Sequence, residues 1–394
     1  MNKQTIALVD CDSFFVSCEQ AVDETLKDKP VCVISGHNGC VLARSTQAKE
    51  MGVKMGMPYF MAIKEFPQAI YVDVNHQLYK DFSRKVMKIL RDFSPTVEVY
   101  SIDEAFVNLS GLKKLYNKNP LGIAKLIREK IKEDVGIDVS IGVSKSKVLA
   151  KLACEMAKPK VGNGICLIGQ AKIPKILKTT KIQATWGIGK NTTLALNRWG
   201  IMTCEDLVTK PDDWLKTRIG KRGVELRHEL LGESIDKIKT KRRLPKSIQN
   251  TRSFPKPTDN LDYIKNALNI HIHNSCTKLR HFKGKCKTVG VMLKTKDFIV
   301  YYDKENFKDL ANFELEISRL ALKILEKLYN RNVLYRSCGV TLENIDYNTE
   351  SQLNLFEEAK GEKFSKLAGA IDKLEEKFGR NVVRTGFTEA SKEA

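Results

Sequence analysis

Apolar and polar positions follow two different periodicities in the first 160 residues of the chain. Short continuous apolar runs predict buried strands, because a strand covered on both faces carries apolar side chains at successive positions. Such runs occur at Ile6–Val9, Pro30–Ile34, Val41–Arg44 and Val139–Val143. Apolar residues three or four apart predict helices at about 13–24, 45–51, 79–93, 121–133 and 145–157. Together the two patterns predict a mixed α/β core.

The pattern changes beyond Lys160. Short helices are predicted around residues 186–190, and the basic stretch 239–246, which contains a proline, is typical of a linker on a charged surface. Residues 247–345 then predict the order strand, helix, strand, strand, helix, strand. The predicted strands include Val289–Leu293, Ile299–Asp303 and Tyr335–Leu342. We therefore expect a small α+β domain after the linker.

Carboxylates stand at two places where this pattern predicts a core. Asp10 and Asp12 directly follow the first apolar run. Asp103 and Glu104 fall in the predicted turn of a hairpin between residues 96–100 and 105–109. Grouped ionised carboxylates repel one another and lose hydration unless a positive charge joins them, and oxygen ligands favour Mg²⁺. Such a site suits metal-assisted phosphoryl chemistry with two ions.

A simpler interpretation stays open for each acidic motif. Asp10 and Asp12 could cap a turn, and Asp103 and Glu104 could be solvated hairpin residues. Adjacent residues of a regular strand also point to opposite faces. If Asp103 and Glu104 both reach one metal site, we therefore expect irregular backbone there.

The charge of the chain is unevenly distributed. The net charge is +20; residues 171–346 hold 35 Lys and Arg against 19 Asp and Glu, whereas residues 1–170 hold 24 against 19. A carboxylate-bearing first part and a basic second part suggest catalysis in one region and binding of a polyanion in the other. The alternative is a basic surface that serves solubility only.

The ten cysteines are scattered, with no Cys-x-x-Cys pair. We find no secretory leader and no long apolar segment, so the sequence favours free thiols and a reducing, cytoplasmic location. A zinc site would need regular ligand spacing. The His and Cys residues of one stretch are irregularly spaced, and we assign no metal to them: His271, His273, Cys276, His281 and Cys286.

Three motifs in their order along the chain resemble the Y-family translesion DNA polymerases. They are Asp10 followed by Phe14-Phe15, the segment Tyr100–Phe106, and the segment from Gly142 to Lys147 leading to Ala157-Lys158-Pro159. The resemblance covers residues 1 to about 346. Within the family, residues 38–44, 52–56 and 186–189 look most like UmuC, the catalytic subunit of DNA polymerase V.

The resemblance implies a right hand of α/β and α+β domains with an added little finger. We place the palm at 1–20 and 76–170, the fingers at 21–75, the thumb at 171–240, the little finger at 246–346 and a tail at 347–394. It also implies catalytic acids at Asp10, Asp103 and Glu104 and two Mg²⁺ ions, with the Cys11 carbonyl as a further metal ligand.

Nucleotide contacts are implied for a further set of residues. Phe15 falls at the family's steric gate, beside Phe14, and Asp12 stands where UmuC-type chains commonly have Asn. Shape alone excludes an added hydroxyl by only a few kcal/mol, so sugar selection should be finite. Positive charges at the triphosphate are expected from Arg44, Lys49 and Lys158, and a hydroxyl contact is expected from Thr46.

The thumb and the tail carry binding motifs. Residues 182–189 followed by 194–196 look like a helix-hairpin-helix, whose glycines let backbone N–H groups approach a DNA phosphate. The DNA-binding residues predicted on this basis and in the linker are Gly187, Gly189, Lys190, Lys241, Arg242 and Arg243. The residues of the tail that match the bacterial sliding-clamp peptide are Gln352, Leu353, Leu355 and Phe356. A helical apolar stripe at 364–378 could pack internally or bind a partner.

The resulting hypothesis is a DNA-directed DNA polymerase that performs error-prone translesion synthesis in DNA repair and the SOS response. The partners implied are primer-template DNA, a dNTP, the clamp and, by analogy with UmuC, a processed UmuD-like dimer and a RecA filament. A DinB-type DNA polymerase IV is the nearest alternative, because Asp10-x-Asp12 and Phe14-Phe15 fit it slightly better. A metal-dependent nuclease and a non-catalytic DNA-binding scaffold are further alternatives.

Overall fold

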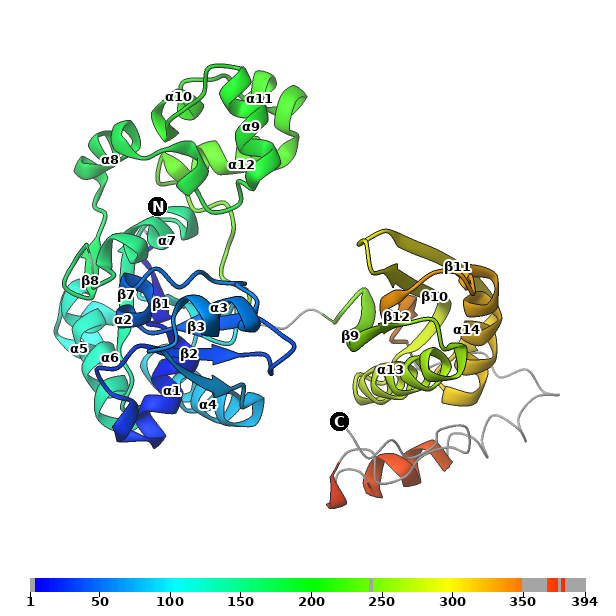
Figure 1. The fold of residues 1–394 in the computed structure, drawn as a ribbon. Coiled ribbons are helices and arrows are strands. Elements are labelled where there is room, and N and C mark those ends of the chain that lie inside the picture. The colour runs from blue at the N-terminus through cyan, green and yellow to red at the C-terminus, as the bar shows by residue number, and fades with distance from the viewer. Residues whose placement is uncertain (1–3, 160, 241–243, 349–366, 375–376, 380–394) are drawn as a thin grey trace. The chain divides into compact units, whose positions relative to one another are not determined.

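The chain divides into two compact units, Met1–Arg242 and Arg243–Ala394 (Figure 1). The computed structural model describes residues 4–159, 161–240, 244–348, 367–374 and 377–379. In this described part, no helix is both long and apolar enough to span a membrane.

A five-stranded sheet forms the centre of the first unit, in the order β5-β6-β1-β7-β8. Its strands are β1 (Ile6–Cys11), β5 (Val97–Val99), β6 (Glu104–Asn108), β7 (Val139–Ser144) and β8 (Ile165–Leu167). All six residues of β1 are buried because β1 lies between β6 and β7, antiparallel to both. The apolar run that predicted this strand is thus explained by burial on both of its faces.

Helices cover the two faces of this sheet, and the alternation along β1 assigns each side chain to a face. The helices are α1 (Phe14–Val22), α4 (His76–Phe93), α5 (Leu112–Tyr116), α6 (Pro120–Val135) and α7 (Lys147–Ala157). Ala7 and Val9 pack in one core with α1, α4 and α6. Ile6 and Leu8 pack on the opposite side against α7, and Asp10 shares their side by the same alternation.

Helix α7 approaches the sheet unusually closely at Gly142. A Cβ atom at this position would lie 2.0 Å from the backbone nitrogen of Cys154 and 2.2 Å from the carbonyl oxygen of Ala150. Only glycine fits such an approach of backbone to backbone. The tight contact brings the polar side chains of α7 within reach of the end of β1.

A smaller sheet in the order β3-β2-β4 lies within residues 31–73. Its elements are β2 (Val31–Ile34), β3 (Val41–Arg44), α2 (Thr46–Glu50), α3 (Tyr59–Glu65) and β4 (Ile70–Asp73). Ser45 caps α2, because its hydroxyl accepts from the backbone N–H of Ala48. This sheet has its own small core, which includes Cys32, Ile34 and Val53.

Short helices make up the rest of the first unit. They are α8 (Ile173–Thr179), α9 (Lys190–Arg198), α10 (Cys204–Val208), α11 (Asp212–Ile219) and α12 (Lys221–Leu230), with a 3-10 turn at Ile182–Ala184. Their core is shared with α7 through Val148, Leu149 and Ala153. Ser146, the N-cap of α7, donates its hydroxyl to the carbonyl of Glu229 in α12 at 2.6 Å. Helix α7 thus links the five-stranded sheet to the helical region.

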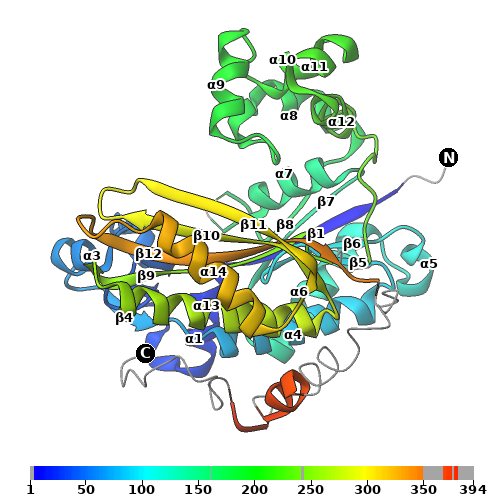
Figure 2. The same cartoon turned by 90° about the vertical axis from the view of Figure 1, so that its right-hand side faces the viewer.

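The second unit is an antiparallel sheet in the order β11-β10-β12-β9, packed against two helices (Figure 2). The elements are β9 (Ser247–Thr258), α13 (Leu261–His281), β10 (Lys285–Thr295), β11 (Val300–Ala311), α14 (Glu314–Leu328) and β12 (Tyr335–Asp346). The order strand, helix, strand, strand, helix, strand predicted from the sequence is confirmed. Residues 367–374 are helical, and Ala368 and Ile371 are buried. Asp372 in this helix accepts two hydrogen bonds, of 2.7 and 2.8 Å, from Arg280 of α13.

The pH stability of the second unit is expected to depend on His271, which is only 5% exposed. Burial lowers the pKa of His271 to about 4, and its Nδ1 contacts Asn250 Oδ1 at 2.6 Å. The folded pKa lies below the unfolded value of about 6.5, so stability is complete above that pH and is lost as the pH falls toward 4. We expect a loss of up to about 1.4 kcal/mol per pH unit in urea unfolding. The variant His271→Gln should lack this dependence; an identical pH profile in the variant would contradict it.

The predicted elements differ from the observed ones at a few places. Glu104 is the first residue of β6 and not part of the hairpin turn. Helix α4 begins at His76, three residues before the expected start. The short elements α3, β4, α5 and β8 were not predicted.

Candidate active site

Two acidic side chains meet on the α7 side of the five-stranded sheet. Asp10 of β1 and Glu104 of β6 are direct neighbours in the antiparallel register. The ammonium of Lys151 lies between them, 2.5 Å from Glu104 Oε1 and 3.3 Å from Asp10 Oδ2. Lys151 lies in α7, the helix that packs on this face of the sheet, so its side chain can reach both carboxylates. Neither the pairing nor the lysine contact depends on long flexible loops.

Burial dominates the electrostatics of this pair. Asp10 is 6% exposed, and burial raises its pKa to about 7, against the opposing charges of Lys158 and Lys151 and with the help of Glu104. Burial works against the charge of Lys151 too, but its contacts with Glu104 and Asp10 raise the pKa of Lys151 above the usual value. One oxygen of the pair, Glu104 Oε2, is buried and has no hydrogen-bond partner among the described residues. An unsatisfied buried carboxylate oxygen is costly unless a cation completes it.

Lys158 adds a second positive charge at the same place. It is the C-cap residue of α7, 3.7 Å from Asp10 Oδ2 and 2.8 Å from Glu155 Oε1. Burial opposes its charge, yet Glu155 and Asp10 raise the pKa of Lys158. Lys151 and Lys158 are seven residues apart, two helical turns, so they share one face of α7.

Asp103 lies beside this pair without joining it. It stands before the first residue of β6, and its side chain accepts a hydrogen bond from the hydroxyl of Ser101. Its backbone carbonyl accepts from the N–H of Cys11 at 3.0 Å. Because Asp103 lies outside the strand, the expected conflict of strand alternation between Asp103 and Glu104 does not arise. Burial, followed by the charges of Asp103 and Asp10, raises the pKa of the Cys11 thiol.

Asp12 does not cap the helix that follows it. The N-cap residue of α1 is Ser13, which has φ 47° and no side-chain capping bond. The carboxylate of Asp12 instead accepts from the hydroxyl of Ser140 at 2.8 Å, and burial raises its pKa. The Asp10 carboxylate contacts Lys151 and Lys158, so the described contacts of both side chains are made to other elements, and the interpretation of Asp10 and Asp12 as turn caps is wrong.

The two adjacent phenylalanines have different surroundings. Phe14 is 4% exposed and packs in the main core, so its ring has little surface for a nucleotide, and the substrate contact expected at Phe14 stays a prediction. Phe15 is half-buried and stacks on Tyr79, with 4.2 Å between ring centroids and 13° between planes. Tyr79 is fully buried, and its hydroxyl donates to Glu19 at 2.6 Å. The Phe15 ring is therefore held in place from α4.

The three expected triphosphate contacts of the smaller sheet region are accessible to different degrees. Thr46 and Lys49 are exposed on α2. Arg44 ends β3, is half-buried, and donates one guanidinium N–H to the carbonyl of Val53.

The predicted DNA contacts of the thumb lie in the turn before α9. Gly187 has φ +95°, a conformation that favours glycine, and a Cβ atom at Gly189 would meet nothing within 4 Å. Lys190 is exposed in the first turn of α9. Trp186 of the same turn donates to the Tyr100 hydroxyl at 3.1 Å, which joins the turn to the carboxylate hairpin.

Several predicted residues lie outside the part that the structure describes. In the linker these are Lys241, Arg242 and Arg243, and in the tail they are Gln352, Leu353, Leu355 and Phe356.

The acidic pair fits a divalent cation in its donor set, although the arrangement is not a finished ligand shell. Among the residues with described positions, no three acidic, His or Cys side chains are arranged to hold a metal ion. At this site only Asp10 and Glu104 meet, with Lys151 between them, while the Asp103 side chain accepts from Ser101. Both side chains offer oxygen donors, which Mg²⁺ prefers. Glu104 Oε2 is available as a ligand because it has no partner among the described residues.

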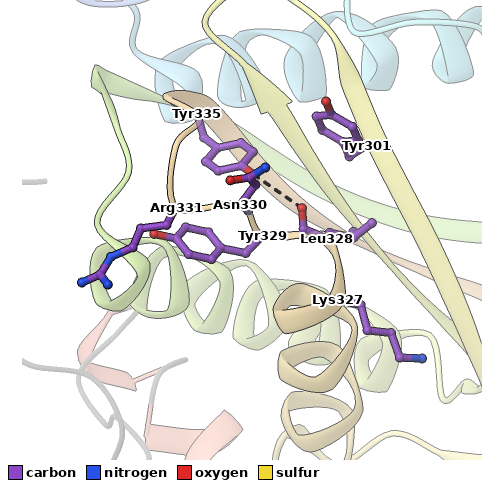
Figure 3. A pocket seen from close by; sticks show the side chains of 7 residues that line it. All are labelled: Tyr301, Lys327, Leu328, Tyr329, Asn330, Arg331 and Tyr335. Atoms are coloured by element: carbon purple, nitrogen blue, oxygen red, sulfur yellow. Dashed lines mark hydrogen bonds between the residues drawn. The ribbon is translucent and has the colours of Figure 1, made fainter.

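A pocket of about 480 Å³ in the second unit has a different character (Figure 3). Its lining consists of Tyr301, Lys327, Leu328, Tyr329, Asn330, Arg331 and Tyr335. None of the described residues that line it is acidic, so these residues do not supply the ligands that a hard divalent metal requires.

Comparison with known proteins agrees with this architecture. The model of the impB/mucB/samB family matches residues 9–155, and the model of that family's C-terminal domain matches residues 245–355. A DNA polymerase IV of Dehalococcoides mccartyi (strain CBDB1) is 33% identical over 98% of each chain. The protein UmuC of Salmonella typhimurium is 29% identical, over 96% of this chain and 92% of its own.

Solved structures show the same fold. A chimera of the Y-family DNA polymerases Dbh and Dpo4 superposes with a TM-score of 0.72 at 27% identity, covering 86% of this chain and 99% of its own. An insertion ternary complex of Dbh DNA polymerase gives a TM-score of 0.59 at 27% identity, with the same coverage.

The fold and the acidic site thus define a nucleotidyltransferase that acts on DNA. The chain belongs to the impB/mucB/samB family and is a Y-family DNA polymerase, with the separate C-terminal antiparallel sheet of that fold. It performs error-prone synthesis across damaged template in DNA repair. Members of this family generally use divalent metal ions.

Sequence reasoning missed two residues of the site. Lys151 contacts both carboxylates and Tyr79 supports Phe15. The spacing of Lys147 and Lys151 on one predicted helix, with Lys158 directly after its end, was a usable signal, because residues four and seven apart share a helix face. Nothing in the sequence alone pointed from Tyr79 to Phe15, 64 positions away.

Proposed function

We propose that Asp10, Glu104 and Asp103 hold two Mg²⁺ ions, with the Cys11 carbonyl as a further ligand, for nucleotidyl transfer from a dNTP to a primer 3′-hydroxyl. The observation that carries this proposal is the buried pair of Asp10 and Glu104, whose oxygen Glu104 Oε2 has no partner. When bound, the ions would make the primer hydroxyl more acidic and neutralise charge on the leaving pyrophosphate.

The protein's own cations would bind the triphosphate. Lys158 is fixed near Asp10 by its bond to Glu155 and so can neutralise charge that builds on the leaving group. Arg44, Thr46 and Lys49 would reach the same phosphates from the smaller sheet region, where Thr46 and Lys49 are exposed. Arg44 would first exchange its bond to the Val53 carbonyl for a phosphate oxygen.

Phe15 would exclude the 2′-hydroxyl of a ribonucleotide by shape, since its ring is held against Tyr79. Replacing Phe15 with Ala is expected to lower discrimination against ribonucleotides by about 100-fold, the range that shape selection against a hydroxyl reaches. The ratio of kcat/KM for dNTP and rNTP insertion measures this. The matched control is Phe14→Leu, a change in the core that should lower thermal stability and leave the ratio unchanged. A Phe15→Ala ratio equal to that of the wild type would exclude the gate.

Backbone N–H groups and basic side chains would bind the DNA phosphates. Gly187 and Gly189 leave the turn before α9 open to a phosphate, with Lys190 beside it. Lys241, Arg242 and Arg243 of the linker would add phosphate contacts. Binding of primer-template DNA should therefore weaken steeply with salt.

The domain assignment from the sequence remains part of this proposal: palm 1–20 and 76–170, fingers 21–75, thumb 171–240, little finger 246–346 and tail 347–394. The five-stranded sheet, the three-stranded sheet and the α8–α12 helices fall within the first three ranges almost entirely.

Partners would be recruited through the tail. Residues 352–356 match the bacterial sliding-clamp peptide, and two apolar anchors on a tether gain strength from high effective concentration. We place the enzyme in the cytoplasm at the nucleoid, acting in the SOS response.

The subtype we favour is UmuC, supported by the residue matches at 38–44, 52–56 and 186–189, and with it a processed UmuD-like dimer and a RecA filament as partners. DNA polymerase IV is the alternative, supported by Asp12 and by the Phe14-Phe15 pair. Identities of 33% and 29% to the two types are similar and do not separate them.

Primer extension on undamaged and lesion-containing templates tests the proposal. We expect Mg²⁺-dependent extension through the lesion, stimulated by the clamp. Shortening of the DNA on addition of Mg²⁺ would instead indicate a nuclease. Extension that depends on a UmuD-like protein would favour the UmuC type, and full activity of the chain alone would favour polymerase IV.

A further inference from the structure

We propose that Lys151 is a stand-in cation, which occupies the metal position between Asp10 and Glu104 in the free enzyme and must leave it before a divalent ion binds. The inference rests on the proposed metal site. Lys151 is then a positioning residue: it keeps the two carboxylates together and limits metal binding in the absence of substrates.

The Lys151 ammonium lies between the two carboxylates. It lies 2.5 Å from one carboxylate and 3.3 Å from the other, so a single charge bridges the two acids as a metal ion would. The side chain is only 18% exposed, and those of Asp10 and Glu104 are 8% and 16% exposed. Water therefore screens these charges less than at the surface.

Lys151 leaves the hydrogen-bonding capacity of the two carboxylates incompletely satisfied. Glu104 Oε2 is buried and finds no partner in the described part of the chain, although the same carboxylate is ion-paired through Oε1. An ion pair that served stability alone would be expected to use its acceptors fully. A lysine is a point charge on a flexible stem, so it can be displaced by rotation about its side-chain bonds.

Lys151 and a divalent ion cannot occupy the position between Asp10 and Glu104 at the same time. The two positive charges would share one poorly hydrated space, where like charges repel strongly. The free enzyme should therefore bind divalent metal weakly, and removal of the lysine charge should strengthen the binding. A merely structural role of Lys151 predicts the reverse, because a disordered site binds metal less well.

The test is titration of the full chain with Mn²⁺, without DNA or dNTP, followed by the electron paramagnetic resonance signal of free Mn²⁺. We expect Lys151→Met, which keeps the apolar stem, to bind Mn²⁺ on the order of tenfold more tightly than the wild type. Lys151→Arg keeps the charge and should behave like the wild type. The matched control is Lys88→Met, which removes an exposed lysine of α4.

Two further variants make the result specific. The gain in Lys151→Met should vanish in the double variant Lys151→Met with Asp10→Asn, because the ion would lose its ligand. Equal or weaker Mn²⁺ binding by Lys151→Met overturns the proposal, as does a gain that survives the Asp10 change.

If Lys151→Met does not fold, the proposal can be tested on the wild-type protein. Lysine reductive methylation read by mass spectrometry should show low reactivity of Lys151 in EDTA and at least about threefold higher reactivity in Mn²⁺, as its contacts with the acids are lost. Unchanged reactivity overturns the proposal. Primer extension by the wild type tests the proposed function separately. The proposed function and the proposed role of Lys151 can therefore fail independently.

Discussion

Replacing Asp10 with Asn is expected to slow primer extension by about 1000-fold while the protein stays folded. A metal-bound carboxylate supports several kcal/mol of transition-state stabilisation, and each 1.36 kcal/mol is a factor of ten in rate. Asp10 contacts both lysines of the site, Lys151 and Lys158, and interacts with Glu104. The rate at saturating dNTP measures the effect.

The same substitution should not lower the stability of the metal-free protein. Burial raises the pKa of Asp10 from 3.8 to about 7, so its stabilising contribution is complete below the unfolded pKa and is lost as the pH rises through the folded pKa. A neutral Asn avoids this loss. We expect the thermal midpoint of Asp10→Asn at pH 8 in EDTA to equal or exceed that of the wild type.

The control for charge loss is Asp138→Asn. Asp138 directly precedes β7 and is half exposed, with an ion pair to Lys132 at the surface. Its variant should extend primers at the wild-type rate. Extension by Asp10→Asn above about a tenth of the wild-type rate would contradict the metal role of Asp10.

Replacing Lys147 with Met is expected to lower the free energy of unfolding of the first unit by about 3–5 kcal/mol, the cost of leaving buried charges unpaired. Lys147 is fully buried. Its ammonium contacts Glu98 at 2.7 Å, Asp236 at 3.3 Å and the carbonyl of Lys237 at 3.0 Å. It thereby fixes the chain leaving α12 to the edge strand β5 of the five-stranded sheet.

Urea unfolding followed by circular dichroism measures this loss. The control is Lys145→Met, two residues earlier, where the side chain contacts Gln170 at the surface; its effect should stay within about 0.5 kcal/mol. Adding Glu98→Gln to Lys147→Met should recover part of the loss, because one unpaired charge is removed. A Lys147→Met variant as stable as Lys145→Met would show that the buried ion pairs contribute nothing.

Much of the fold could be predicted because its elements are long or strongly patterned. The second unit alternates regular strands with helices of 21 and 15 residues, and its order followed directly from the sequence. The missed strands β4 and β8 have four and three residues, too few to show a period. Each carries only three apolar residues in a row, Ile70–Val72 and Ile165–Leu167, and these residues are half-buried.

The site could be predicted in part for a similar physical reason. Asp10 was found because a carboxylate at the end of an apolar run is unusual, and Glu104 because it adjoins a second such run. The role of Lys151 depends on three-dimensional packing that a sequence does not display. It requires the register of β1 with β6 and the close approach of α7 that Gly142 permits.

The most direct test of the account is a count of bound Mn²⁺ in a complex with dideoxy-terminated primer-template DNA and the matching dNTP. We expect about two ions per wild-type chain, and loss of at least one of them in Asp10→Asn. The same number of ions in both proteins would contradict the claim that this buried acidic pair holds the metal.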